Sequence, residues 1–262
     1  MQSAPRPTAL VTGASSGLGA DFAALLARDG YDLVLVARSV PAMEALAARA
    51  RAEHGTTTHV LSIDLAKPGA TAEVTRALAE RGLEVDVLIN NAGFGDNAIV
   101  AEADAAVLTG MTQLNVTTLT DLTRAVLPGM IARRRGRVML LGSTAAFQPG
   151  PHMAVYCATK AYVLSFGEAL AYELRGTGVT ATTVCPGATA TGFQLASGLN
   201  VDTPLVKSGM MTSAEVARQG YAAMKLGTPV IVTGIPNLVS ATMGRHLPHF
   251  LSLPIAARLL GK

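Results

Sequence analysis

Residues 8–19, TALVTGASSGLG, decide the fold of this chain. A short apolar run leads directly into Gly13, Gly17 and Gly19, and an alanine- and leucine-rich stretch follows. This order predicts a buried strand, a glycine-rich turn and the start of a helix. The amide groups at a helix N-terminus attract anions, and glycines let a ligand approach the main chain closely. The stretch therefore predicts a turn on which a pyrophosphate can rest.

The glycine spacing, G-x3-G-x-G, is one residue wider than the common dinucleotide fingerprint. Glycines at such a turn can also serve only to tighten it, so the turn by itself leaves both interpretations open. Its position after the first of several strand patterns favours the phosphate-binding interpretation, because open parallel sheets bind nucleotides at this point.

Strand and helix patterns alternate along the rest of the chain. Strands are expected at 8–13, 32–37, 58–63, 86–90, 137–142, 179–184 and 230–234. Helices are expected at 17–28, 40–53, 70–81, 110–134, 154–175 and 213–226. Most of the strand patterns are continuously hydrophobic, which is typical of strands covered on both faces. We therefore predict an α/β fold, a doubly wound Rossmann-type domain whose seven-stranded, mainly parallel sheet carries helices on both faces.

The composition suits one large domain. Half of the 262 residues are hydrophobic and only 15% are charged, which excludes a disordered chain. We expect a single domain over residues 1–262 with a flexible tail at 1–7, since no linker or internal repeat interrupts the alternation.

Other features limit where the protein works and what it binds. Cys157 and Cys185 are too few for a disulfide framework, and no secretory signal precedes the first strand. Apolar windows such as 227–244 are interrupted by prolines, so we predict no integral membrane segment and a cytoplasmic location. The basic run at 133–137 falls where a helix should end and complements the helix dipole, so we predict no nucleic-acid partner.

The end of the second predicted strand indicates which nucleotide is bound. An acid that reads a ribose hydroxyl is expected about 20 residues after the glycine turn. This chain instead has Ala37 followed by Arg38, and a cation suits a ribose 2′-phosphate. An ordinary surface arginine is the alternative. The pattern favours NADP(H) over NAD(H).

A tyrosine and a lysine lie four residues apart in YCATK, residues 156–160. Residues at this spacing share a helix face, so Tyr156 and Lys160 can project into one cleft. A neighbouring cation favours the phenolate, and we therefore expect Lys160 to lower the pKa of Tyr156. A packed ring beside a snorkelling amine is the alternative explanation of the pair.

Taken in order, these motifs resemble the short-chain dehydrogenase/reductase family over essentially the whole chain. The motifs are TGASSGLG (12–19), Asp64, NNAG (90–93), Asn115, Ser143, YCATK (156–160) and PGATAT (186–191). Each is weak alone, but their order and their places in the predicted fold make the resemblance specific.

The resemblance implies roles for these residues. Tyr156 would be the general acid or base, Lys160 would also bind the nicotinamide ribose, Ser143 would orient the substrate oxygen, and Asn115 would hold a proton-relaying water. The implied cofactor-binding residues are Gly13, Ser15, Ser16, Gly17, Leu18, Gly19, Arg38, Asp64, Leu65, Asn91, Ala92, Gly93, Tyr156, Lys160, Pro186, Gly187, Thr189 and Thr191. A strand-end serine and a loop-start aspartate remain the plainer interpretations of Ser143 and Asp64.

The substrate side is apolar. In the family, the segment corresponding to 186–212 covers the substrate, and here it carries only Asp202 and Lys207 as charges. Candidate lining residues are Phe147, Met153, Phe193, Leu195, Met210 and Met211. This favours a small apolar carbonyl or alcohol substrate. Its identity, the physiological direction of the reaction and the role of the apolar tail after Ile235 stay open. His246 and His249 have zinc-like spacing without an evident third ligand, so we predict no metal.

The sequence thus predicts an NADP(H)-dependent oxidoreductase. A non-catalytic NADP-binding regulator on the same fold is the alternative, and a sugar-nucleotide epimerase of the longer branch would need a larger C-terminal domain. The predicted helix at 110–134 carries apolar residues on more than one face, and family members commonly pair the corresponding helix. We therefore expect a homodimer or a homotetramer.

Overall fold

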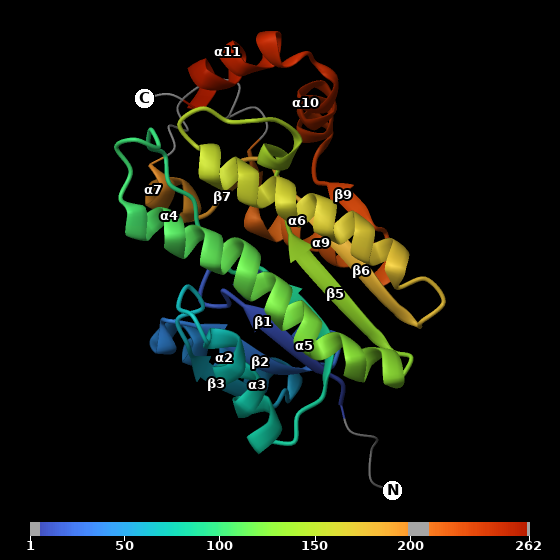
Figure 1. Ribbon diagram of the computed structural model, residues 1–262. Helices are drawn as coiled ribbons and strands as arrows, with labels where there is room; N and C mark the ends of the chain where they lie inside the picture. Colours follow the sequence, from blue (N-terminus) through green and yellow to red (C-terminus); the bar gives the residue numbers. More distant parts are fainter. Residues whose placement is uncertain (1–5, 199–209, 261–262) are drawn as a thin grey trace, which may run out of the picture.

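The computed structural model describes residues 6–198 and 210–260. Seven strands form one parallel sheet in the order β3-β2-β1-β4-β5-β6-β9, and a short β7-β8 pair forms a second sheet (Figure 1). The main strands are β1 (Thr8–Thr12), β2 (Asp32–Ala37), β3 (Thr58–Ser62), β4 (Val85–Asn90), β5 (Gly136–Leu141), β6 (Val179–Cys185) and β9 (Val230–Val232). The small sheet pairs β7 (Thr189–Ala190) with β8 (Met211–Thr212). The predicted doubly wound sheet is confirmed.

Helices cover both faces of the sheet. One face carries α1 (Gly17–Arg28), α2 (Val40–His54) and α9 (Ser213–Leu226). The other carries α3 (Ala70–Glu80), α5 (Leu119–Ala132) and α6 (Ala154–Glu173). Alternate residues of β1 serve the two cores, since Ala9 and Val11 pack on the first face and Leu10 on the second. Burial on both faces explains why this strand is continuously apolar.

The remaining helical elements lie toward the carboxyl ends of the strands (Figure 1). They are α4 (Ala105–Thr112), a π-helical segment η1 (Gln113–Thr118), a 3-10 turn η2 (Thr144–Phe147), α7 (Phe193–Ser197), α10 (Ile235–His246) and α11 (His249–Leu260). Within the described residues, every helix is too short or too polar to cross a membrane.

Two differences from the sequence prediction stand out. The single helix expected at 110–134 is α4, the π-helical segment and α5 in succession. The tail after Ile235 forms α10 and α11, which the periodicity did not predict because Pro236 and Pro254 fall within an apolar stretch.

The apolar residues that suggested a pairing helix pack within the same chain. Met111, Leu119, Leu122 and Met130 are each at most 4% exposed and belong to the molecule's own cores. Leu114 and Val126 are partly buried and pack against one of the same cores. Intramolecular packing therefore accounts for them, and they carry no evidence for oligomerisation.

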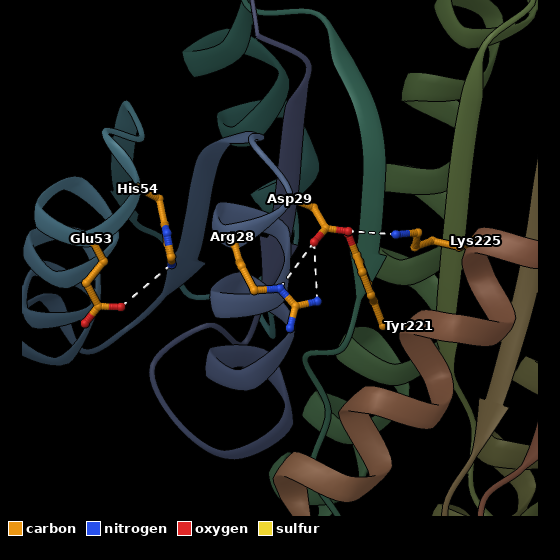
Figure 2. A network of polar contacts seen from close by, with 6 residues as sticks. All are labelled: Arg28, Asp29, Glu53, His54, Tyr221 and Lys225. Carbon is orange, nitrogen blue, oxygen red and sulfur yellow. Dashed lines mark hydrogen bonds and ion pairs between the residues drawn. The ribbon is translucent and has the colours of Figure 1, made fainter.

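Ion pairs fasten the ends of the helices. The basic run is a helix terminus, as predicted: α5 ends at Ala132, and Arg135 binds the carboxylate of Asp86 at 2.8 Å. On the opposite face, Asp29 accepts hydrogen bonds from Tyr221 at 3.0 Å and Lys225 at 2.8 Å (Figure 2). These contacts join the end of α1 to α9, whose own start is held by a Thr212 capping box.

Gly167→Ala should destabilise the protein because α6 lies directly on β6 at this point. A Cβ on Gly167 would overlap the Thr183 side chain, and overpacking of this kind costs about 1–3 kcal/mol. Denaturant unfolding measures the loss. Gly110→Ala in α4 is the matched control, since its Cβ would meet only Phe94 at 3.8 Å.

Adding Thr183→Ala to Gly167→Ala should recover most of the stability, because it removes the overlapping hydroxyl. Equal losses in the single and double variants would show that the close approach of α6 to β6 is not the cause.

Candidate active site

Hydrogen bonds join the ends of β1 and β4, where the strand order reverses. The Thr12 hydroxyl accepts from the amides of Asn91 and Ala92, both at 3.0 Å, and donates to Ile89 O at 3.2 Å. The Asn91 side chain donates to Thr12 O at 2.9 Å and Gly13 O at 3.2 Å. Gly13 has a φ of +65°, which favours glycine, and its carbonyl lies against α1. The glycine turn is thereby fixed to the neighbouring strand.

A cleft of about 970 Å³ opens at this end of the sheet. Nearly every residue predicted for the cofactor or for catalysis lines it: Gly13, Ser15, Ser16, Gly17, Leu18, Arg38, Asp64, Leu65, Asn91, Ala92, Gly93, Ser143, Tyr156, Lys160, Pro186, Gly187, Thr189 and Thr191. The two exceptions are Gly19 and Asn115, which lie behind its wall. A Cβ on Gly19 would overlap Gly13 O, so this glycine permits close packing of the turn on α1.

One end of the cleft has the features of a nucleotide-phosphate site. Ser16, the N-cap residue of α1, makes no side-chain capping hydrogen bond, so no serine hydroxyl occupies the first amides of this helix. Arg38 is exposed after the buried Ala37, and both line the cleft. Asp64 accepts from the Ala66 amide at 3.2 Å, so it also stabilises its own loop.

The other end holds the predicted catalytic group. Ser143 follows β5 and caps the 3-10 turn, where its Oγ accepts from the Ala145 amide at 3.1 Å. The Ser143 side chain also lies next to the Tyr156 hydroxyl on α6 and acts to lower the pKa of this tyrosine. The centroid of the Tyr156 ring lies 5.4 Å from the centroid of the Phe193 ring. The structure therefore brings Ser143 and Tyr156 together beneath apolar side chains.

The pKa of Tyr156 is raised, not lowered as the YCATK spacing predicted. Burial raises the pKa of Tyr156, and the neighbouring Ser143 side chain opposes that rise only in part. Burial also lowers the pKa of Lys160, to about 8. Its Nζ donates to Leu141 O at 2.7 Å and lies 5.7 Å from the Tyr156 ring centroid. The sequence placed the two residues side by side but could not show that burial governs the pKa of each.

Asn115 lies in the π-helical segment, and its amide is fully engaged. Its Nδ2 donates to Phe94 O at 2.9 Å and to Thr159 Oγ1 at 3.1 Å, and its Oδ1 accepts from the Phe94 amide at 3.2 Å. These bonds join the loop after β4 to the helix that carries Tyr156. A π-helical turn inside an α-helix often marks a functional site, and here it turns the amide inward.

The substrate side is partly as predicted. Phe147, Met153 and Phe193 line the cleft, whereas Met210 and Met211 do not. Residues 199–209, with Asp202 and Lys207, and the side chain of Leu195 lie outside the described part of the chain.

The structure adds polar lining residues that the sequence analysis missed. Gln194 hydrogen-bonds both Thr191 and Thr189, and Asn237 of α10 donates to Thr233 O at 2.9 Å. Gln194 follows the PGATAT motif closely, which could have indicated it. Asn237 belongs to a helix that the periodicity did not reveal. Within residues 6–198 and 210–260, no three histidine, cysteine or acidic side chains cluster as metal ligands do.

A family model described as short chain dehydrogenase matches residues 7–200. The chain belongs to this family. The resemblance stated from the motifs is thereby confirmed, and the sheet order and cleft agree with it.

Three similar proteins show the range of the family. An uncharacterized oxidoreductase of Myxococcus xanthus is 39% identical over 69% of this chain and 71% of its own length. A very-long-chain 3-oxoacyl-CoA reductase of Coprinopsis cinerea is 36% identical over 65% of this chain, but only 51% of its own length is matched. The short-chain dehydrogenase of Sphingobium yanoikuyae, solved in complex with NADPH, has a TM-score of 0.81 and 36% identity, over 87% of this chain and 88% of its own.

Lys160→Met should stabilise the protein near pH 7. With the pKa lowered from 10.5 to about 8, keeping this buried ammonium charged costs up to about 3 kcal/mol. The variant loses one hydrogen bond to Leu141, so we expect a net gain of about 1–3 kcal/mol in the free energy of unfolding.

The gain should depend on pH. From about pH 8 to 10.5 the unfolded wild type binds more protons at this lysine than the folded state, so wild-type stability rises there relative to the variant. The advantage of Lys160→Met should therefore shrink across this window in denaturant titrations. Lys67→Met, at an exposed position, is the control. A pH-independent advantage would contradict the buried-charge explanation.

Proposed function

We propose that this short-chain dehydrogenase transfers a hydride between the nicotinamide of NADP(H) and a carbonyl or secondary alcohol group of an apolar small molecule. The observation that carries the proposal is the position of Ser143 and Tyr156 side by side in the wall of the cleft. Lys160 lies beside the pair with its ammonium directed to a strand end.

The cleft fits a dinucleotide. The uncapped first amides of α1 suit the pyrophosphate, and the exposed guanidinium of Arg38 suits the ribose phosphate. Thr191 faces Gly17 across the cleft closely enough that a Cβ on this glycine would come within 3.2 Å of it. When bound, the cofactor supplies or accepts the hydride. The NADPH complex of the Sphingobium yanoikuyae protein supports this assignment.

Tyr156 performs the proton step. Burial raises its pKa, so its hydroxyl stays protonated near neutral pH and can donate to a carbonyl oxygen. Ser143 orients that oxygen through its own hydroxyl. Lys160, with a pKa of about 8, is mainly cationic near neutral pH and stabilises negative charge that develops on the tyrosine oxygen. Asn115 positions α6 through Thr159.

The substrate is a hydrophobic ketone or aldehyde, or the corresponding alcohol. Phe94, Phe147, Met153 and Phe193 supply apolar side chains around the proton donor. The name of the Coprinopsis cinerea relative, a reductase of very-long-chain 3-oxoacyl groups, supports an apolar carbonyl compound. A screen of NADPH oxidation with apolar ketones and aldehydes tests the activity. Cofactor binding without turnover of any compound would favour a non-catalytic NADP-binding regulator.

Two further assignments stay as proposals. We keep a cytoplasmic location, because Cys157 and Cys185 are both free and buried. We also keep a homodimer or homotetramer, now on the exposed aromatic residues Tyr162 and Tyr172 of α6, which are 38% and 67% exposed.

Tyr156→Phe should abolish turnover while leaving NADPH binding nearly unchanged, because only the proton donor is removed. General acid–base catalysis contributes about 10²–10⁴-fold, so kcat should fall by that factor. Tyr162→Phe is the matched control on the same helix; its hydroxyl contacts only Thr120 at 2.9 Å. A Tyr156→Phe enzyme that kept more than a tenth of the wild-type kcat would exclude Tyr156 as the acid.

Arg38→Ala should raise the KM for NADPH by about 10- to 150-fold and leave the KM for NADH almost unchanged, because hydrogen bonds to a charged group contribute about 1.5–3 kcal/mol. Ala37→Asp should weaken NADPH further and improve NADH, by repelling the phosphate and accepting from a free ribose hydroxyl. Arg49→Ala, at another exposed arginine, is the control. Equal catalytic efficiency of the wild type with both cofactors would refute the preference.

A further inference from the structure

The two C-terminal helices, α10 and α11, expose their large apolar side chains and bury their small or polar residues. Their buried side chains are small or polar: Asn237, Ala241, Gly244, Ser252 and Ala256. Their large apolar side chains are exposed, and we call these seven the outer face: Ile235, Leu238, Val239, Met243, Phe250, Leu251 and Ile255. Ile235 is 79% exposed and Phe250 is 75% exposed. Large apolar side chains gathered on two exposed helices in this way mark an interaction surface.

The C-terminal segment that carries the outer face has basic residues but no acidic ones. Residues 216–262 contain no aspartate or glutamate but include five lysines and arginines. Arg245 and Arg258 are exposed on α10 and α11 beside the apolar side chains. Arg245 has only a 3.9 Å contact with Glu168, and Arg258 has no ion-pair partner among the described residues. Exposed large apolar residues beside exposed cations suit an anionic lipid interface.

The same helices border the cleft. Pro236, Asn237, Ser240 and Gly244 of α10 and Ala256 of α11 line it, so one side of this helix pair faces the cleft while the other faces outward. Figure 1 shows both helices at the far end of the molecule, beyond the carboxyl ends of the strands. A surface held against the outer face therefore lies next to the site where an apolar substrate would enter.

We propose that the outer face docks on the surface of an anionic lipid bilayer, with Ile235, Phe250 and their neighbours in the interface. A second copy of the chain fits less well. A two-fold contact places identical patches together, so the cations of both copies would approach each other, and residues 216–262 supply no acid to offset them. The lipid headgroups supply the negative charge that this part of the chain lacks.

Co-sedimentation of the full chain with vesicles tests the proposal. The vesicles are phosphatidylcholine alone and phosphatidylcholine containing phosphatidylserine. We expect binding to the anionic vesicles that weakens as salt is added, because the ionic attraction is screened. Binding is measured without substrate, so its outcome is independent of whether the enzyme reduces any compound in the activity screen.

The decisive variant is Ile235→Gln with Phe250→Gln. Each removed side chain should weaken vesicle binding by about tenfold or more, through lost apolar burial. Leu226→Gln with Tyr172→Gln is the matched control, at positions 84% and 67% exposed on α9 and α6, and should bind like the wild type. All four side chains are exposed, so denaturant unfolding should be unchanged in both pairs.

A second pair tests the charge. Arg245→Gln with Arg258→Gln should lose about fivefold per arginine on anionic vesicles only, since each cation near such a surface contributes about 1 kcal/mol. Arg49→Gln with Arg124→Gln is the control, at exposed positions on α2 and α5.

Three results would overturn the proposal: no binding to either vesicle, equal binding to both, or equal loss in the outer-face pair and its control. Light scattering distinguishes the alternative occupant. A second copy of the chain would cover this face if two results came together. The wild type would not bind vesicles, and the Ile235→Gln, Phe250→Gln variant would have a lower oligomer mass than the wild type.

Discussion

The hydrogen bonds of Thr12 and Asn91 are the constraint on which the site depends. Adjacent parallel strands normally carry their connections in the same direction, and a crevice opens only where the connections diverge. Here the connections after β1 and β4 diverge, and hydrogen bonds of the Thr12 hydroxyl and the Asn91 side chain join the ends of these two strands. The turn at Gly13 cannot move away from β4 without breaking these bonds. The first amides of α1 and the loop after β4 are therefore held on the same crevice before any ligand arrives.

At the other end of the crevice, two locally destabilising features hold the catalytic helix in position. Lys160 is 6% exposed and holds its ammonium on Leu141 O, although burial opposes the charge. Asn115 interrupts a helix with a π-helical turn so that its amide can bind Phe94 and Thr159. Both features are unfavourable locally, and both fix the helix that carries Tyr156. Such local conflicts are expected where a fold serves chemistry.

The sequence predicted the sheet and the cleft well because each depends on local pattern. Continuous apolar runs reveal strands buried on both faces, and the glycine turn, Ser143 and Tyr156 each follow such a run or a helix start. What could not be read depends on three-dimensional burial. The lowered pKa of Lys160, the partners of Asn115 and the packing of Met111 all arise from residues distant in sequence. The helices α10 and α11 were missed for a different reason. Pro236 and Pro254 fall within the apolar stretch that forms them, and their large apolar residues face outward instead of into a core.

That inversion also explains why the cleft wall near α10 is made of small and polar residues. Gly187 packs so closely on Asn237 that a Cβ on this glycine would overlap the Asn237 amide. A Cβ on Gly244 would likewise come within 2.9 Å of the Gln148 side chain. Large side chains on the inner side of α10 would push it away from η2 and from the loop after β6. The apolar residues of this helix are thus excluded from the cleft and left on the outer face, where they add hydrophobic area outside the molecule's own cores. The close packing that shapes one wall of the cleft therefore also creates the exposed apolar surface behind it.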